Sequence, residues 1–128
     1  MKKHPGKLLR TLALSLLFIT GNVVAEVPPA QLKEIAHLMA FMQNTDCLLE
    51  RNGTKYASKK ALLHIKRKYE YFTDKIHTTE DFIKYSATKS EISGKFYLAH
   101  CPKEPTMKLS DWLYLELKDY REKRMPIK

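Results

Sequence analysis

The sequence predicts a mostly helical α+β domain with about four helices, two short antiparallel strands and one disulfide bond. Apolar residues recur at helical spacing in four segments. Two short apolar stretches, each adjoining one of the two cysteines, have the length and composition of strands. The expected order along the chain is therefore α-β-α-α-β-α.

Residues 1–25 have the pattern of a cleavable signal peptide. Residues 1–10 contain four basic residues and no acid, and residues 11–20 are almost all apolar. Val23-Val24-Ala25 then supplies the small side chains that a signal peptidase recognises. We expect cleavage after Ala25 and a location in the bacterial periplasm or outside the cell. The alternative is an uncleaved anchor, but the apolar run is short for a membrane span.

Residues 26–128 are expected to form one small globular domain with a modest core. The first 25 residues hold four of the 23 basic residues and none of the 14 acidic ones, which leaves a net charge of +5 on the remainder. This charge favours an anionic partner, such as an acidic protein or a lipid surface. It is too small to indicate nucleic-acid binding, and no nucleic-acid partner is expected.

The first helix is expected over about residues 29–44, because prolines are common where helices begin. Its apolar stripe consists of Leu32, Ile35, Ala36, Leu38, Met39, Phe41 and Met42. The first strand is expected at Cys47–Glu50, ending at the turn signal Asn52-Gly53.

The second helix should begin near Ser58, a good N-cap residue. One side carries an apolar stripe of Ala61, Leu62, Ile65, Tyr69 and Phe72. The other sides carry Lys59, Lys60, Lys66, Arg67 and Lys68. We interpret these basic residues as a solvated face, with docking to an anionic surface as the alternative.

The third helix should be capped by Thr78 or Thr79 and should run towards a stop at Gly94. Its small-residue face comprises Phe82, Ile83, Ser86, Ala87 and Ser90. The second strand is expected over residues 96–100. The fourth helix should begin at Ser110 and bury Trp112, Leu113, Leu117 and Tyr120, with a frayed tail from about residue 121.

Cys47 and Cys101 are the only cysteines, so an oxidising compartment favours a bond between them. They are 54 residues apart, and closing such a loop is worth about 4 kcal/mol in the chain-entropy model. If the two strands pair antiparallel, the cysteines lie side by side, as a disulfide requires. The alternatives are two free thiols or an intermolecular bond.

Catalytic and metal motifs are weak. Ser86 and Lys89 form an S-x-x-K pair, but the S-D-N and K-T-G elements that accompany it in serine hydrolases are missing. Gly94-Lys95 lacks the remainder of a phosphate loop. The histidines of the expected domain, His37, His64, His77 and His100, have no close ligand spacing. We expect no enzymatic activity, no cofactor and no metal.

Several stretches together resemble a family of small exported bacterial proteins known only as a domain of unknown function. They are Cys47–Gly53, Ala61 with His64, Lys68-Tyr69, Thr79–Ile83, Ala87–Ser90, Ser93–Lys95 with Tyr97, Cys101, and Trp112-Leu113 with Glu116-Leu117. The resemblance covers roughly residues 47–121. The chain departs from the family pattern at Leu49, where an aromatic residue is usual, and at Thr88, where Ser is usual. The resemblance implies a set of polar site positions: Arg51, Asn52, His64, Lys89, Ser90 and Ser93.

These six residues are expected to form one polar network around the disulfide. The network is either structural, satisfying buried polar groups, or a small cleft for an anionic group with Arg51 and Lys89 as donors. We expect a non-enzymatic periplasmic protein that binds an envelope protein or other macromolecule, as an inhibitor, immunity protein or accessory factor. The alternative is a binder of a small anionic ligand or lipid headgroup, and a distant one is a hydrolase using Ser86 and Lys89.

Overall fold

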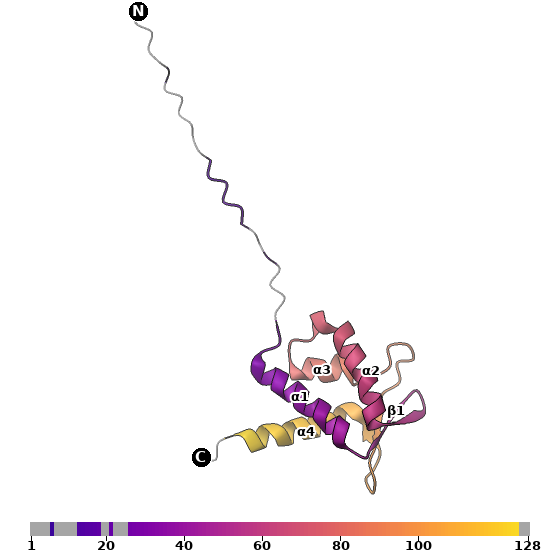
Figure 1. Cartoon of the computed structure of the whole chain (residues 1–128). Coiled ribbons are helices and arrows are strands. Elements are labelled where there is room, and N and C mark those ends of the chain that lie inside the picture. Colours follow the sequence, from indigo (N-terminus) through magenta and orange to yellow (C-terminus); the bar gives the residue numbers. More distant parts are fainter. Residues whose placement is uncertain (1–5, 7–12, 19–20, 22–25, 126–128) are drawn as a thin grey trace, which may run out of the picture.

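The computed structural model describes residues 6, 13–18, 21 and 26–125. The segment that we assign to the signal peptide therefore lies largely outside the described residues. Residues 26–125 contain four α-helices and a small antiparallel sheet (Figure 1). The elements are α1 (Pro29–Asn44), β1 (Leu48–Arg51), β2 (Thr54–Ala57), α2 (Ser58–Tyr71), the 3-10 helix η1 (Thr73–Lys75), α3 (Thr79–Ser86), β3 (Leu98–His100), β4 (Met107–Lys108) and α4 (Leu109–Arg124). This confirms the predicted α+β class.

The sheet has the strand order β2-β1-β3-β4, with antiparallel neighbours throughout. The two predicted strands are β1 and β3, and they pair with each other. Two further strands extend the sheet at its edges. Asn52 and Gly53 both adopt positive φ angles, 51° and 80°. This two-residue turn folds the chain back onto β1, so that β2 forms immediately after it.

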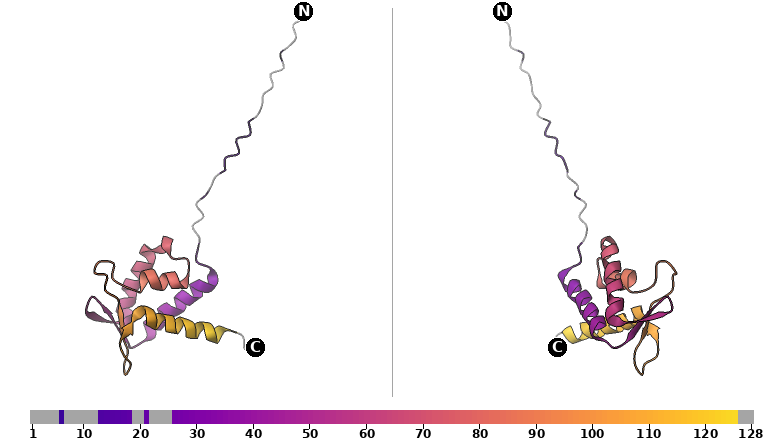
Figure 2. Two further views of the ribbon diagram at one scale, coloured as in Figure 1. Left: turned by 180° about the vertical axis from the view of Figure 1, so that it is seen from behind. Right: turned by 45° about the vertical axis from the view of Figure 1, so that its right-hand side comes forward.

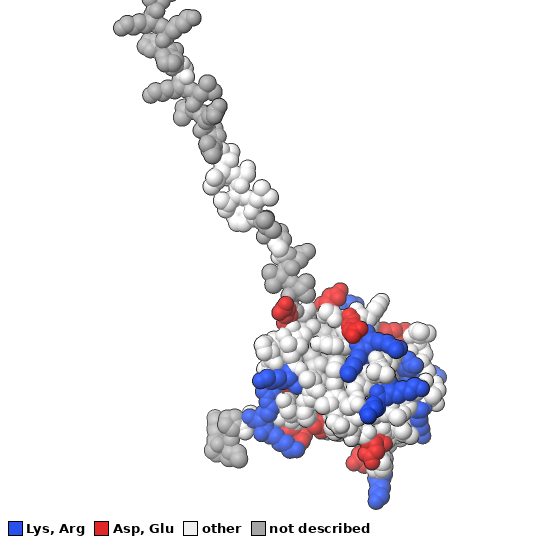
Figure 3. All heavy atoms as spheres, in the orientation of Figure 1, with Lys and Arg blue, Asp and Glu red and all other residues white. Residues whose placement is uncertain are grey.

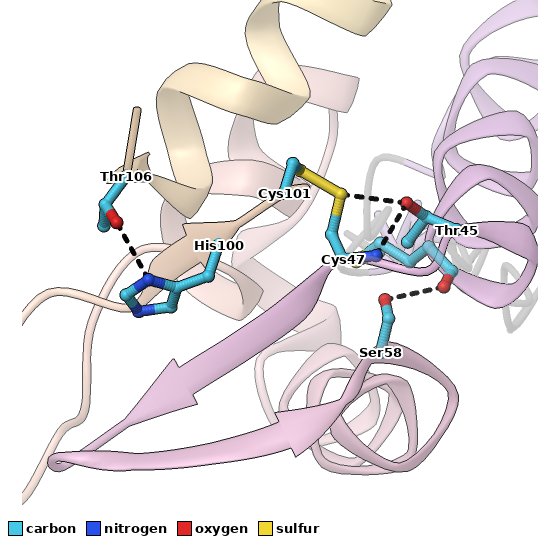
Figure 4. Close-up of a disulfide and its surroundings, with 7 residues drawn as sticks. Thr45, Cys47, Ser58, His100, Cys101 and Thr106 are labelled. Carbon is cyan, nitrogen blue, oxygen red and sulfur yellow. Dashed lines mark hydrogen bonds between the residues drawn. A yellow bond between two sulfur atoms is a disulfide. The ribbon is translucent and has the colours of Figure 1, made fainter. Parts of the chain in front are cut away.

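The predicted disulfide joins Cys47 and Cys101, whose Cα atoms are 4.2 Å apart. The register of the sheet explains this proximity, because Leu48 of β1 lies opposite His100 of β3. Thr45 supports the bond, since its hydroxyl lies 3.0 Å from the Cys47 sulfur and accepts a hydrogen bond from the Cys47 amide (Figure 4).

The four helices pack against one another, and the small sheet lies at one end of this helical layer (Figures 1 and 2). α1 contacts α2, α3 and α4. The core between them contains Leu38, Met42, Phe82, Ile83 and Leu113, all fully buried. Leu49 and Ala99, neighbours across β1 and β3, are also buried, whereas Leu48 is exposed. One face of the sheet therefore covers the core.

The third helix is shorter than predicted, because α3 ends at Ser86 and not near Gly94. The Ala87 amide and the Thr88 hydroxyl both donate to the Ile83 carbonyl, and such side-chain bonds compete with helix continuation. The chain then folds back as a loop closed by the bridge between Lys89 and Phe96. Gly94 occupies a turn with φ of 70° inside this loop. We call residues 88–97 the return loop.

The helix starts also differ in part from the prediction. Thr78 caps α3 together with Asp81, as expected. Ser58 is instead the first helical residue of α2, and its buried hydroxyl donates to the Met42 carbonyl over 2.6 Å. Ser110 lies inside α4, which begins at Leu109.

The end of α4 is anchored where fraying was expected. The helix continues to Arg124. Arg121 donates to both carboxylate oxygens of the buried Glu34 over 2.7 and 3.0 Å, and it also pairs with Glu80. These contacts hold α4 to α1 and α3. In the part of the chain that the structure describes, no helix is long and apolar enough to span a membrane.

Candidate functional site

A cavity of about 190 Å³ lies between the β1–β2 hairpin and α2. We call it the hairpin cleft. Alternation along β1 places Leu49 and Arg51 on the same face of the strand, and Tyr56 of β2 lies opposite Leu49. On α2, Lys60, His64 and Arg67 follow at helical spacing and line the same cavity. Strand alternation and helix periodicity thus bring these side chains to one place.

The floor of the hairpin cleft is apolar and its mouth is basic. Leu49, Ala61, Ile65 and Leu109 line it, and all but Ala61 are buried core residues. The charged lining residues are the basic Arg51, Lys60 and Arg67 and the acidic Glu50, whose carboxylate lies 2.9 Å from Nε2 of His100. Arg67 and Lys60 are exposed, and Arg51 is half-buried.

Arg51, His64 and Tyr97 form the inner wall of this cleft. Nη1 of Arg51 lies 3.0 Å from Nδ1 and 3.3 Å from Nε2 of His64. Nε2 of His64 lies 3.1 Å from the Tyr97 hydroxyl oxygen. A guanidinium can only donate, so the imidazole nitrogen that it contacts must accept, and His64 must be neutral. We assign Nδ1, the nearer nitrogen, as the acceptor, and Nε2–H then donates to Tyr97.

Burial and the neighbouring positive charges shift the pKa values of His64 and Tyr97. Burial, and after it the positive charges of Arg51, Lys68 and Arg67, lower the pKa of His64 below its ordinary value of 6.5. Burial also raises the pKa of the Tyr97 hydroxyl. Both side chains are therefore neutral at pH 7, so that of the three wall residues Arg51 alone adds charge to the cleft.

Lys68 stands behind this wall and is only 8% exposed. Its ammonium group donates to the Lys89 carbonyl over 2.6 Å and to the Tyr97 hydroxyl over 3.3 Å. The Glu91 carboxylate lies 3.5 Å away. Burial lowers the pKa of Lys68, and the charge of Glu91 opposes that shift. The prediction that placed Lys68 on a solvated basic face is wrong.

The sequence did contain a signal for the burial of Lys68. The residue continues the spacing of Ala61 and Ile65 on the inner side of α2, with Phe72 one turn later. A lysine in an apolar helical stripe indicates a buried amine that needs acceptors. We missed this signal by grouping Lys68 with its exposed basic neighbours.

Asn52, Ser90 and Ser93 join the hairpin turn to the return loop. The Ser93 hydroxyl donates to the Asn52 side-chain oxygen over 2.5 Å, and the Asn52 amide reaches the Ser90 hydroxyl at 3.5 Å. The Ser90 hydroxyl also accepts from the Ser93 amide, and the Ser93 hydroxyl from the Lys95 amide. These three residues shape the loop that carries Tyr97 to the cleft.

The structure therefore brings together Arg51 with His64, and Asn52 with Ser90 and Ser93, and it adds Lys68 and Tyr97. Lys89 takes part through its backbone carbonyl, and among residues 26–125 its side chain forms no hydrogen bond or ion pair. The network also lies away from the disulfide. It occupies the Arg51 end of β1, whereas Cys47 precedes the opposite end.

Ser86 does not form the predicted pair with Lys89, because α3 ends at Ser86 and Lys89 belongs to the return loop. Ser86 is fully buried, and its hydroxyl is the one buried side-chain polar atom without a hydrogen bond in the described part of the chain. Its oxygen is not accessible to a substrate in this structure.

The positive charge at the cleft is not neutralised internally. Among residues 26–125, neither Arg51, Lys60 nor Arg67 forms an ion pair with a carboxylate. Arg51 and Lys60 lie 5.6 and 5.5 Å from the centre of the Tyr56 ring, and Arg51 lowers the pKa of the Tyr56 hydroxyl through a hydrogen bond. Basic side chains gather on the right-hand side of Figure 3, where α2 lies in Figure 1.

Two other hollows lie on the described surface. One, of about 400 Å³, lies on the return-loop side of the wall and shares Arg51, His64, Arg67 and Tyr97 with the hairpin cleft. The other, of about 410 Å³, lies along α1 and includes His37, Phe41 and Asp46. No group of three or more His, Cys, Asp or Glu side chains is arranged to hold a metal ion within the described residues.

A sequence-family model described as "Family of unknown function (DUF5329)" matches residues 29–121. The matched segment contains the whole sheet and every residue of the hairpin cleft and its wall. No curated protein and no solved structure matches the chain.

Proposed function

The chain belongs to the family of unknown function DUF5329, and we propose that it is a non-enzymatic, exported protein that binds another envelope protein through the hairpin cleft. One observation carries the proposal. Arg51, Lys60 and Arg67 surround the mouth of an apolar cavity, and none of them forms an ion pair with a carboxylate of residues 26–125. An inhibitor, an immunity protein or an accessory factor would each use such a surface.

Electrostatics give this surface a preferred partner. Three cations at the mouth of one cavity create a positive potential that steers an anionic group towards it. A carboxylate that enters would form charge-assisted hydrogen bonds, which are stronger than neutral ones. The partner should therefore present an acidic group to the cleft.

Export rests on two observations. The basic, apolar and small-residue segments within residues 1–25 form the signal pattern, and the described apolar side chains of that region, Leu14, Leu16, Leu17 and Phe18, are exposed. The Cys47–Cys101 disulfide is typical of an oxidising compartment. We place the mature protein, beginning at Glu26, in the periplasm or outside the cell.

The hydrolase alternative required Ser86 and Lys89 to lie on one face of a helix, and they do not. Its nucleophile would be Ser86, whose hydroxyl is fully buried and separated from Lys89 by the end of α3. The second candidate function is binding to an anionic lipid surface. It is supported by the exposed side chains of Leu63 and Tyr71 on α2, beside exposed basic residues, a combination typical of peripheral membrane contacts.

Affinity capture tests the proposed function. The tagged protein is expressed in its host and recovered from a periplasmic extract, and captured proteins are identified by mass spectrometry. Arg67→Ala should lose the specific partner, whereas Lys66→Ala, a neighbouring exposed change outside the cleft, should retain it. Capture should also weaken as salt rises.

Two results would contradict the proposal. One is a partner held equally by both variants, which would place the interface elsewhere. The other is capture of no partner together with co-sedimentation of the protein with phosphatidylglycerol vesicles, which would favour the lipid alternative.

A further inference from the structure

Resting on the proposed function, we infer that the hairpin cleft receives the C-terminal residue of a partner polypeptide, an apolar side chain with a free carboxylate beside it. The apolar side chain fills the floor of the cleft. The carboxylate pairs with the cations at its mouth. The proposed function requires only that the cleft bind an anionic group. The inference names the chemical class of that ligand.

The floor fits one apolar group of limited size. Leu49, Ile65 and Leu109 belong to the core, yet they also line a cavity of about 190 Å³. An apolar protein cavity of about 150 Å³ is large enough to bind benzene. A phenylalanine ring or a leucine side chain therefore fits, and burying it removes apolar surface of both molecules from water.

The mouth fits a carboxylate. Arg51 uses Nη1 for His64, which holds its guanidinium in position and leaves further N–H groups for a ligand. A guanidinium forms paired hydrogen bonds with a carboxylate. Lys60 and Arg67 add charge from α2. The ligand charge would thus be shared by a positioned arginine and two exposed cations.

The juxtaposition of floor and mouth favours a chain end over an internal acidic residue. In a C-terminal residue, the side chain and the carboxylate branch from the same Cα atom, so both reach one narrow cavity. In an extended segment, neighbouring side chains point to opposite faces. An internal Asp or Glu next to an apolar residue would therefore point away from the cleft when the apolar group entered it.

Calorimetric titration of the purified protein with small chain-end mimics tests this inference. The probes are N-acetyl-L-phenylalanine, its amide, and N-acetylglycine. The first should bind. The amide should bind about tenfold more weakly or worse, because it loses hydrogen bonds to charged groups. N-acetylglycine should also be weaker, because it leaves the apolar floor empty.

Variants assign the binding to the cleft. Ala61→Leu adds a side chain that fills the floor and keeps a good helix-forming residue, so it should abolish binding with the melting temperature maintained. Lys60→Ala should weaken binding by several-fold. Lys59→Ala, its exposed neighbour outside the cleft, should leave binding unchanged. A melting curve for each variant checks that it folds.

Three outcomes overturn the inference: equal binding of the acid and the amide, binding that survives Ala61→Leu, and tighter binding of phenylacetate than of N-acetyl-L-phenylalanine. The last would assign a free small acid in place of a polypeptide end. Failure here is distinguishable from failure of the proposed function. If the mimics do not bind but Arg67-dependent capture persists, the proposed function stands and the chain-end ligand is wrong.

Discussion

At the scale of single residues, Tyr97 connects the cleft to the core. Its hydroxyl oxygen accepts from His64 on one side and from Lys68 on the other. Lys68 in turn donates to the Lys89 carbonyl of the return loop. The phenol thus joins the return loop to α2 directly and to Arg51 of β1 through His64.

Replacing Tyr97 with Phe should lower the free energy of unfolding by about 1–3 kcal/mol, because it leaves the half-buried His64 and the buried Lys68 without their shared acceptor at nearly constant volume. Urea unfolding monitored by circular dichroism measures this. Tyr71→Phe is the control, since Tyr71 is 79% exposed, and its change should stay within about 0.5 kcal/mol. Equal effects of the two changes would rule out the link described for Tyr97.

His64 should make stability depend on pH. Its pKa in the folded protein lies below the ordinary value of 6.5, so the unfolded chain binds a proton at a higher pH than the folded one. The contribution is therefore fully present above pH 6.5 and is lost as pH falls from there towards the folded-state pKa. Glu34, whose pKa is lowered from 4.5 mainly by its hydrogen bond with Arg121, acts only at more acidic pH.

Unfolding free energies of the wild type and His64→Gln, measured from pH 7.5 to pH 5, test this contribution. The wild type should lose more stability than the variant over that range. Parallel pH profiles for the two proteins would mean that His64 does not titrate differently on folding.

The six polar positions were grouped by the family resemblance, and the structure places them in two sets. Asn52 meets Ser90 and Ser93 where the hairpin turn faces the return loop, and Arg51 at the end of β1 meets His64 inside α2. Lys68 was misplaced because it was grouped with its exposed basic neighbours, although it continues the apolar spacing of Ala61 and Ile65. The acceptor that it finds on the return loop is a long-range contact, which no local pattern in the sequence specifies.

At the scale of elements, the β1–β2 hairpin forms the open side of the cleft. Its turn requires a left-handed conformation at both Asn52 and Gly53. Asn tolerates this conformation, and Gly adopts it without cost. The turn was predictable from Asn-Gly, but β2 after it was not, because its exposed, polar residues lack the apolar pattern of a strand.

Gly53→Ala should destabilise the protein by about 1–2 kcal/mol, because φ at this position is 80° and a left-handed residue with a Cβ costs about that much. An added Cβ would meet no atom within 4 Å, so the loss would come from the backbone and not from a clash. Thermal or urea unfolding against Lys55→Ala, an exposed change in the same hairpin, isolates the effect. A loss no greater than that of Lys55→Ala would mean that the turn does not need glycine.

The third helix shows why element ends were harder to predict than element types. Small residues from Ser86 to Ser90 continue the helical spacing of α3, yet the Thr88 hydroxyl bonds to the Ile83 carbonyl and ends the helix early. Side-chain bonds of this kind compete locally with the backbone. The fold class was therefore predictable, whereas the return loop was not.

At the scale of the whole molecule, one disulfide closes a loop that contains every lining residue of the cleft except Leu109. The Cys47–Cys101 bond encloses β1, β2, α2, α3 and the return loop. Arg121 ties α4 to Glu34 and Glu80 at the opposite end. The disulfide and the Arg121 ion pairs therefore hold together the elements that carry the cleft. We expect its cations to be near one another before a ligand binds.

Reduction of the disulfide should lower the free energy of unfolding by about 4 kcal/mol, the value expected for a loop of this length in the chain-entropy model. Urea unfolding with and without a reductant measures the change, and the Cys47→Ala, Cys101→Ala double variant should reproduce it. A difference below about 1 kcal/mol would show that the bond does not stabilise the fold.

The central claim is that the hairpin cleft is the recognition surface, and a nuclear magnetic resonance titration of the nitrogen-15-labelled protein tests it most directly. With millimolar N-acetyl-L-phenylalanine, amide shifts should be concentrated at Leu49, Arg51, Tyr56, Ala61 and His64, and Ala61→Leu should remove them. Shifts concentrated at His37 and Phe41, in the groove along α1, would contradict the claim.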